Sequence, residues 1–278
     1  MFKLLKILLA TIASIILIIG CLFCYTTFIE PKLLITKTID LSKGSNTDLK
    51  VVHFTDTQLG EYYDLDMLEK AVNKINAENP DIVVFTGDLI DNAAKYTHKD
   101  EIAPILNRIE AKLGKYAIYG NRDYGGSAVR YYKNIMKESG FKLLKNNSDV
   151  IELNGKRIRI LGSDDALLGN PSIKSTTKGI KESDYNILLT HEPDIADKYS
   201  DYPIDLVLAG HSHGGQVYIP FYGPIKKNTM SEKYYKGMYT MDNSYKTKLY
   251  VNTGLGNTKV PFRFMNIPNV TLFNISLR

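Results

Sequence analysis

The chain has 278 residues, of which 44% are hydrophobic and 23% charged, and a formal net charge of +5. This is the composition of an ordinary globular protein, and because lysine and arginine are spread along the chain, no nucleic-acid partner is expected. The two cysteines, Cys21 and Cys24, both lie in an N-terminal apolar segment, which excludes a disulfide-stabilised fold and argues against a structural zinc site of the cysteine type.

The N-terminal segment, residues 1–29, is predicted to be a transmembrane anchor. After Lys3 and Lys6, residues 7–29 carry no charge, and as a helix they are long enough to cross about 30 Å of hydrocarbon. Positive charge at the short end favours a cytoplasmic N-terminus. We expect a single-pass protein of the cell membrane, embedded in the lipid bilayer through residues 7–29, with its larger part outside the cytoplasm.

Two other interpretations of this segment stay open. The sequence LIIGC, ending at Cys21, resembles a bacterial lipoprotein cleavage site, so the segment could be a cleaved and lipidated signal. A helix buried in a protein core is the third interpretation, although the segment is apolar on every face.

The rest of the chain predicts one α/β domain. Residues 30–48 are expected to be an extended lead-in, and strands and helices then alternate. Strands are predicted at 49–54, 82–85 and from 115, and helices at 64–79, 99–114 and 128–140. A hairpin at Asn154-Gly155 and five further strands follow. We expect a four-layer αββα sandwich over residues 49–278, with two sheets face to face and helices outside.

Polar side chains follow five of these strands. The sites of open α/β sheets gather beyond the carboxyl ends of the strands, so we expect these side chains to lie together. They are Asp56, Gln58, Asp88, Asp91, Asn121, Arg122, Asp123, His191, His211 and His213.

The chemistry of this set predicts a metal centre. Imidazole, carboxylate and amide oxygen suit first-row divalent ions such as Mn, Fe, Zn or Ni, and one carboxylate can bridge two ions. Each residue alone has an ordinary interpretation, such as a turn residue, a helix cap or a core histidine. These ordinary interpretations do not explain why all of them follow apolar strands. His53, inside the first strand, is expected to pack in the core, and His98 to lie on the surface.

With these motifs in order, the chain resembles the calcineurin-like metallophosphoesterases. Their pattern is D-x-H, G-D-x-x-D, G-N-H-[DE], a lone histidine and G-H-x-H, and the corresponding stretches here begin at Asp56, Gly87, Gly120, His191 and Gly210. The C-terminal stretches GHSHGGQVYIPFYGP and VNTGLGNTKVPFRF look like the membrane-anchored or exported bacterial branch, which includes phosphodiesterases. That branch is similar to some UDP-diacylglucosamine pyrophosphohydrolases.

The resemblance implies a sandwich of the metallophosphoesterase type and a role for each site residue. Two divalent ions, with Mn favoured, would be bound, and a hydroxide bridging them would attack phosphorus in line. Asp91 and Asp123 would orient the ligands, and Asp123 is grouped with Arg122 at the catalytic position. The first ion would be held by Asp56, Gln58, Asp88 and His213, and the second by Asp88, Asn121, His191 and His211.

Two residues depart from the family pattern. Gln58 replaces a histidine ligand, and its neutral amide oxygen is expected to hold the first ion loosely or leave its position empty. Arg122 replaces the catalytic histidine. An arginine side chain cannot readily donate a proton at neutral pH, but it can clamp phosphate oxygens. The family's pyrophosphohydrolases also have G-N-R-D, which favours a substrate whose leaving group is itself a phosphate.

The sequence therefore predicts an enzyme that hydrolyses a phosphodiester or diphosphate bond in a phosphorylated small molecule or a lipid-linked substrate at the outer face of the membrane. The alternative is a degenerate metallophosphoesterase that binds metal or phosphate without efficient turnover.

Overall fold

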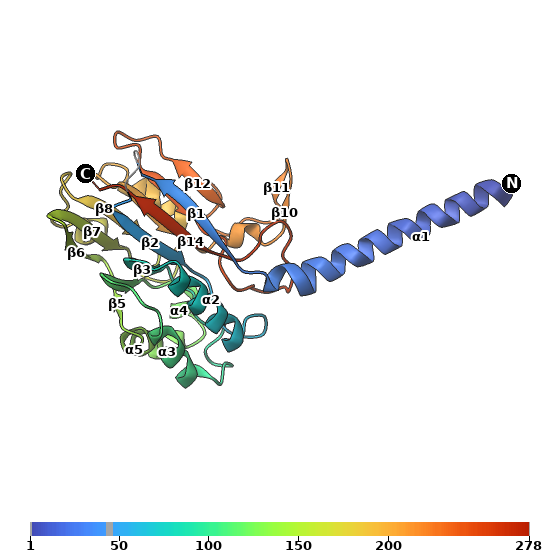
Figure 1. Ribbon diagram of the computed structural model, residues 1–278, viewed down its shortest axis with the longest axis horizontal. Coiled ribbons are helices and arrows are strands. Elements are labelled where there is room, and N and C mark those ends of the chain that lie inside the picture. The colour runs from blue at the N-terminus through green and yellow to red at the C-terminus, as the bar shows by residue number, and fades with distance from the viewer. Residues whose placement is uncertain (1, 43–46, 278) are drawn as a thin grey trace.

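The structure is a computed structural model that describes residues 2–42 and 47–277. Residues 1, 43–46 and 278 of the predicted anchor, lead-in and domain lie outside the described residues. A long N-terminal helix leaves one side of a layered domain that contains all the strands (Figure 1).

The helical elements occur mostly in the first half of the chain. The α-helices are α1 (Phe2–Cys24), α2 (Leu65–Ala77), α3 (Lys99–Asn107), α4 (Asn121–Tyr124), α5 (Tyr132–Glu138) and α6 (Ile173–Thr176). The π- and 3₁₀-helical segments are η1 (Tyr25–Ile29), η2 (Glu30–Lys32), η3 (Ala128–Arg130), η4 (Pro193–Tyr199) and η5 (His213–Gly215).

Two six-stranded mixed sheets form the body of the domain. The first has the order β1 (Ile35–Leu41), β14 (Asn269–Ile275), β2 (Leu49–Phe54), β3 (Ile82–Phe85), β4 (Gly114–Ala117), β5 (Phe141–Leu143). The second has the order β12 (Gly237–Thr240), β13 (Lys248–Val251), β9 (Leu206–Ala209), β8 (Tyr185–Leu189), β7 (Lys156–Gly162), β6 (Asn147–Leu153). A separate hairpin joins β10 (Tyr218–Ile219) and β11 (Gly223–Pro224).

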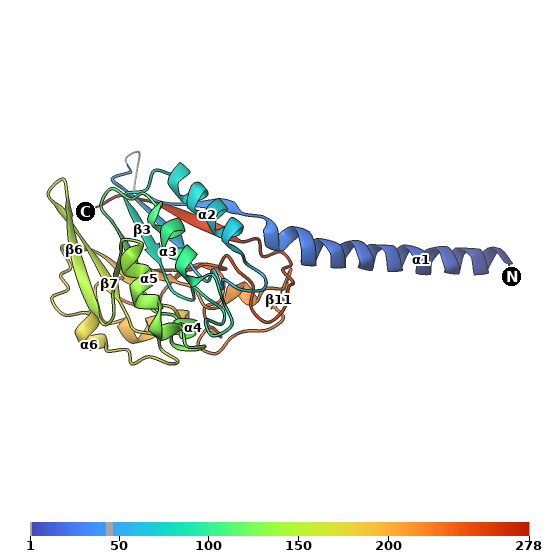
Figure 2. The same ribbon diagram turned by 90° about the horizontal axis from the view of Figure 1, so that it is seen from below.

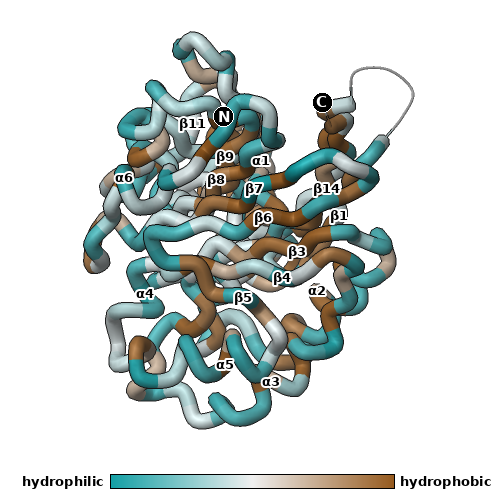
Figure 3. The backbone as a smooth tube through the Cα atoms, turned by 90° about the vertical axis from the view of Figure 1, so that its left-hand side faces the viewer, coloured by the Kyte–Doolittle hydropathy of each residue, from teal (hydrophilic) through white to brown (hydrophobic). Residues whose placement is uncertain are grey.

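The side chains of β2 show how the layers form. Leu49 and Val51 point into the apolar layer between the sheets, where they join Ile187 and Leu208 of the second sheet. Val52 and Phe54, on the other face of the strand, pack in the cluster that includes residues of α2, α3 and α5. Apolar residues accordingly concentrate along the strands (Figure 3), and the predicted αββα sandwich is confirmed.

Two predicted segments take a different form. The helix expected over 99–114 ends at Asn107, because the following chain turns back onto β3: the N–H of Leu113 donates to the carbonyl of Asp81 at 2.7 Å. Gly114, expected to cap this helix, begins β4 instead, with φ of 135°. Within the expected lead-in, residues 35–41 form β1, which pairs in parallel with β14 along its whole length.

The N-terminal helix does not pack in a core. No described residue of α1 is buried, so the interpretation as a buried core helix is wrong. The helix is long and apolar enough to cross a membrane, and a membrane anchor and a signal sequence both fit that description.

The chain enters the domain at a particular sheet edge. β1 runs parallel to β14, which is antiparallel to β2, and the pairs Ile35–Asn269 and Thr271–His53 fix the register. The start of β1 therefore lies at the edge where β2 ends. This is also the carboxyl edge of β3 and β4, which run parallel to β2.

Candidate metal centre

The loops that follow β2, β3 and β9 carry an unusual backbone conformation. Six residues in them that are not glycine have positive φ. Five lie at the strand ends: Asp56 (51°), Gln58 (49°), Asp88 (61°), His211 (65°) and His213 (49°); the sixth is Gln216 (54°). Such residues cost roughly 1–3 kcal/mol each and gather at functional sites, where the surrounding structure holds them in place. The five belong to the set that the strand-end pattern selects.

Two glycines allow these loops to approach one another. A Cβ on Gly210 would come within 2.4 Å of Oδ2 of Asp56, and a Cβ on Gly120 within 2.5 Å of Oδ1 of Asp88. Any larger residue at either position would push a carboxylate out of place. The glycines of the G-N and G-H motifs therefore act here through close packing.

Three histidines share one arrangement, in which one ring nitrogen donates to a backbone carbonyl and the other faces the site. A carbonyl oxygen only accepts, so each hydrogen bond fixes the ring orientation and leaves the opposite nitrogen with a lone pair in the neutral form. The donor–acceptor pairs are His191 Nδ1 to Thr86 O (2.6 Å), His211 Nε2 to Thr229 O (2.9 Å) and His213 Nδ1 to Gly256 O (3.1 Å).

The opposite nitrogen of each ring lies beside an oxygen of another site residue. The distances are 3.4 Å from His191 Nε2 to Asp88 Oδ1, 3.3 Å from His213 Nε2 to Asp56 Oδ1 and 3.1 Å from His211 Nδ1 to Asn121 Oδ1. Ligands about 2.1 Å from one ion lie about 3 Å apart when they subtend a right angle at it. The spacing suits shared coordination.

Unpartnered buried atoms test whether a metal fits. Among the described residues, Asp56 Oδ1, Gln58 Oε1 and His191 Nε2 are buried without a hydrogen-bond partner. Ligand atoms of Asp56, Asp88 and His191 lie within 4.8 Å of one another. Unpartnered buried polar atoms are costly, and these oxygen and nitrogen atoms are of the kinds that coordinate first-row divalent ions. The residues therefore fit a metal centre.

Burial and mutual charge set the protonation of this cluster. Burial raises the pKa of Asp56 to about 6. Burial alone would also raise the pKa of Asp88, but the charge of His191 holds it below its usual range. Burial opposes the charge on His191, yet Asp88 raises the pKa of that ring well above its usual value. The negative charge of Asp88 therefore favours a proton on His191. The same charge would stabilise a metal cation at this position.

The other two histidines favour the neutral form. Burial lowers the pKa of His211 to about 4 and that of His213 to about 3, and in each case positive neighbours add to the effect. Neutral imidazole is the form that binds metal, so these two rings are ready to coordinate at physiological pH.

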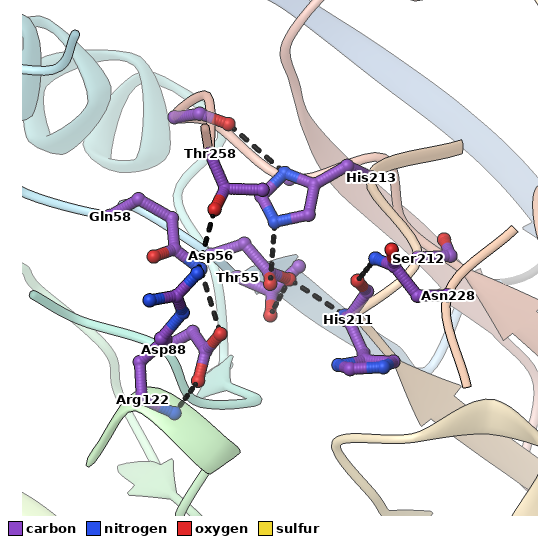
Figure 4. Close-up of polar contacts among 12 residues, drawn as sticks. Thr55, Asp56, Gln58, Asp88, Arg122, His211, Ser212, His213, Asn228 and Thr258 are labelled. Carbon is purple, nitrogen blue, oxygen red and sulfur yellow. Dashed lines mark hydrogen bonds and ion pairs between the residues drawn. The ribbon is translucent and has the colours of Figure 1, made fainter. Parts of the chain in front are cut away.

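Gln58 is brought to the site, but its amide nitrogen faces the expected bridging carboxylate. Nε2 of Gln58 donates to Oδ2 of Asp88 at 2.7 Å, and this leaves Oε1 as the only atom of the side chain that can coordinate (Figure 4). An amide oxygen donates less electron density than imidazole, and the contact uses a lone pair of the carboxylate.

Arg122 lies at the mouth of the site and is held from two sides. Its Nη1 is 3.4 Å from Oδ1 of Asp91, and its Nη2 donates to Oγ1 of Thr258 at 2.9 Å. Its backbone N–H donates to Asp88. Asp91, expected to orient metal ligands, instead orients this guanidinium.

Asp123 supports the site from behind. Its Oδ2 accepts from the N–H groups of Asp88 and Gly120, both at 2.8 Å, and its Oδ1 accepts from Leu89 N–H at 3.0 Å. The side chain is fully buried, so it positions the loop that carries Asp88 and does not face the cleft.

The structure thus brings nine of the ten predicted residues to the carboxyl edge of the strands or directly behind it. The tenth, Asp91, lies further out and contacts Arg122. His53 is buried and bonds Oγ1 of Thr86 at 2.8 Å, and His98 is exposed. Glu192 was missed: it is buried beside His191 and His211, and its place next to His191 was the available signal.

A cleft of about 430 Å³ opens over Gln58, Asp88, Asn121 and the two histidines of the G-H-x-H motif. Its wall includes Arg122 and three lysines that the strand-end pattern did not select, because they lie in loops: Lys226, Lys227 and Lys259. Basic side chains around a cleft favour an anionic ligand.

Fold and site together define a metal-dependent phosphoesterase. The sequence profile of the calcineurin-like phosphoesterases matches residues 49–215, and the chain belongs to this family. It is 39% identical over 257 residues to "uncharacterized metallophosphoesterase YkuE" of Bacillus subtilis, covering 90% of this chain and 88% of that protein. An Aquifex aeolicus metallophosphoesterase is 29% identical, covering 90% and 93%. A solved structure, TT1561 of Thermus thermophilus, is similar with a TM-score of 0.48 and 13% identity, covering 75% and 91%.

Metal binding is predicted to release protons and to strengthen as pH rises. Protons on His191, whose pKa is raised by Asp88, and on Asp56, with a pKa near 6, compete with a cation. Titration calorimetry with Mn²⁺ at pH 6 in buffers of different ionisation enthalpy should show the release of at least one proton. A heat that does not depend on the buffer, or an affinity that falls with rising pH, contradicts this assignment.

Gln58→His is predicted to raise metal content. The imidazole would replace a neutral amide oxygen and remove the amide contact to Asp88. Metal analysis after gel filtration should show more Mn²⁺ per chain in the variant than in the wild type, with Gln216→His as the control at the cleft wall. Equal content in all three proteins would show that Gln58 does not limit the first position.

Proposed function

We propose that this protein hydrolyses a phosphodiester or diphosphate bond with the help of two divalent cations. The observation that carries the proposal is the arrangement of His191, His211 and His213, each locked by a backbone carbonyl and each aimed at an oxygen ligand. Ordinary core histidines do not converge in this way on two buried carboxylates and an amide oxygen.

The donors divide into two groups around Asp88. Asp56, Gln58 and His213 lie on one side, and Asn121, His191 and His211 would complete the other. When bound there, divalent cations supply Lewis acidity and lower the pKa of water. We favour Mn, and Fe, Zn or Ni suit the same donors. The chain's own part is to fix these side chains, through Asp123 and the carbonyl bonds, before substrate arrives.

Substrate binding falls to the basic wall of the cleft. Arg122 presents a guanidinium that Asp91 and Thr258 hold in place, and a guanidinium can bond two phosphate oxygens at once. Lys226, Lys227 and Lys259 add positive charge. A substrate with more than one anionic group fits this wall best.

The leaving group decides between substrates. A guanidinium is a poor proton donor at neutral pH. Burial raises the pKa of Asp123 to about 8, but this side chain accepts from three backbone N–H groups behind the site and does not face the cleft. With neither residue placed to donate a proton to the leaving group, a leaving group that is stable as an anion is favoured. A phosphate, as in a diphosphate, meets this requirement, and the sequence G-N-R-D at residues 120–123, which resembles that of UDP-diacylglucosamine pyrophosphohydrolases, supports this choice.

The N-terminal helix supports a location at the membrane. We propose that residues 1–29 anchor the chain, that residues 30–278 form the catalytic part, and that this part lies at the outer face of the cell membrane. The substrate is then a phosphorylated small molecule or a lipid-linked phosphate that is accessible there. The apolar length of α1 supports the anchor, and Lys3 and Lys6 support the orientation.

Asp88→Asn is predicted to abolish hydrolysis of bis-p-nitrophenyl phosphate by the full-length protein with Mn²⁺. The change keeps the shape but removes the charge that faces both groups of donors, so a loss of at least about 100-fold is expected. Initial rates of p-nitrophenol release measure it.

The matched control for this test is Asp100→Asn, on the exposed first turn of α3, which should retain the wild-type rate. If wild type and Asp88→Asn release p-nitrophenol alike with every divalent metal tried, the enzyme proposal is refuted. Binding of metal without turnover would favour the degenerate alternative.

Arg122→His is predicted to shift substrate preference toward poor leaving groups. An imidazole at this position can donate a proton near neutral pH but loses the two-pronged contact to phosphate. Relative kcat/KM for an alkyl phosphodiester against a diphosphate should rise, while KM for the diphosphate increases. An unchanged ratio would mean that Arg122 has no part in choosing the leaving group.

A further inference from the structure

The β10–β11 hairpin exposes apolar side chains that the domain does not cover. Phe221 is fully exposed and Tyr222 is 76% exposed, and Ile219 and Ile225 flank them. The loop residue Val260, which lies at the cleft wall, is also exposed. Contiguous apolar patches of this kind mark interaction sites. We call these five residues the hairpin patch.

The hairpin patch lies on the side of the domain from which α1 leaves. Figure 1 shows β10 and β11 on the side of the domain where α1 begins to project, and Figure 2, turned by 90°, shows β11 on the same side. The register agrees, because the chain enters at the carboxyl edge of β2. A bilayer crossed by α1 would therefore face this side.

Contacts through residues 262–264 connect the N-terminal helical segment to the hairpin. The ring of Phe23 packs on that of Phe262 with centroids 5.8 Å apart, and the N–H of Arg263 donates to the carbonyl of Thr26 at 2.9 Å. One step further, Phe264 N–H donates to Gln216 O at 3.0 Å, and Tyr218 N–H to Phe264 O at 2.9 Å. The hairpin is thus fixed relative to the helix.

Charge complements the apolar tip. Lys226 and Lys227 directly follow the hairpin and Lys259 precedes Val260, and all three are exposed while lining the cleft. Lysines beside a membrane surface are attracted to anionic lipid headgroups. Aromatic residues such as Tyr222 favour the interface between headgroups and acyl chains.

We propose that the hairpin patch dips into the bilayer that α1 crosses, and so turns the catalytic cleft toward the lipid headgroups. The occupant of the patch is the lipid surface itself. This rests on the proposed anchoring by α1, and it deepens the proposed function: the preferred substrate carries its phosphodiester or diphosphate on a lipid, and reaches the cleft from the membrane side between Arg122 and the three lysines.

Because the chain has no tryptophan, a single Phe221→Trp or Tyr222→Trp reports on this contact alone. The full-length variants are placed in vesicles of phosphatidylcholine and phosphatidylglycerol, with and without bromine on the acyl chains. The control is Tyr245→Trp, in the exposed loop before β13. That loop lies at the sheet edge opposite the site, since β13 runs parallel to β9.

The proposal predicts that tryptophan at 221 or 222 emits at shorter wavelength and loses most of its fluorescence in brominated vesicles, while tryptophan at 245 does neither. Equal emission of all three variants in both vesicle types would overturn it. Equally strong quenching of tryptophan at 245 would also overturn the proposal, because the lipid contact would then not be specific to the side of the domain that carries the hairpin patch. The readout needs no catalysis, so a catalytically inactive protein can still pass the test.

Discussion

The structure depends on holding two carboxylates, Asp56 and Asp88, side by side and out of water. Burial raises the pKa of Asp56 to about 6, and Asp88 remains ionised mainly because His191 takes up a positive charge. Buried like charges are unfavourable unless a cation compensates them. The positive-φ loops, the close approaches at Gly120 and Gly210 and the three carbonyl-bound histidines all maintain an arrangement that divalent cations would stabilise.

The same region also joins the site to the N-terminal helix. Arg263 is fully buried and donates to four oxygens, among them the carbonyl of Gly256, which also accepts from His213. Its backbone N–H donates to the carbonyl of Thr26 in η1, the segment that directly follows α1. The side chain of Glu30, also buried, accepts from the N–H of Asn266. One cluster of polar contacts therefore orients both a proposed metal ligand and the N-terminal helical segment.

Much of this arrangement could be predicted from the sequence, because apolar strands followed by Asp, Asn or His leave little choice of edge. The pattern could not show that Gln58 turns its amide nitrogen to Asp88, or that Asp91 holds Arg122, since both depend on contacts about 30 residues apart. Helical periodicity alone predicted that α3 continues beyond Asn107. In the structure the chain after Asn107 forms tertiary hydrogen bonds to residues 80 and 81 instead. The lysines of the cleft wall lie in loops that have no sequence periodicity. Their place at the cleft could therefore not be predicted from the sequence.

The central claim is that two divalent cations occupy the two groups of donors around Asp88. Anomalous diffraction from crystals grown with Mn²⁺ tests it most directly. The account predicts two peaks flanking the Asp88 carboxylate, one beside Asp56 and His213 and the other beside Asn121, His191 and His211, with ligand distances of about 2.0–2.3 Å. The peak near Gln58 should be the weaker one. No anomalous peak at Asp88, or peaks confined to surface carboxylates, would contradict the account.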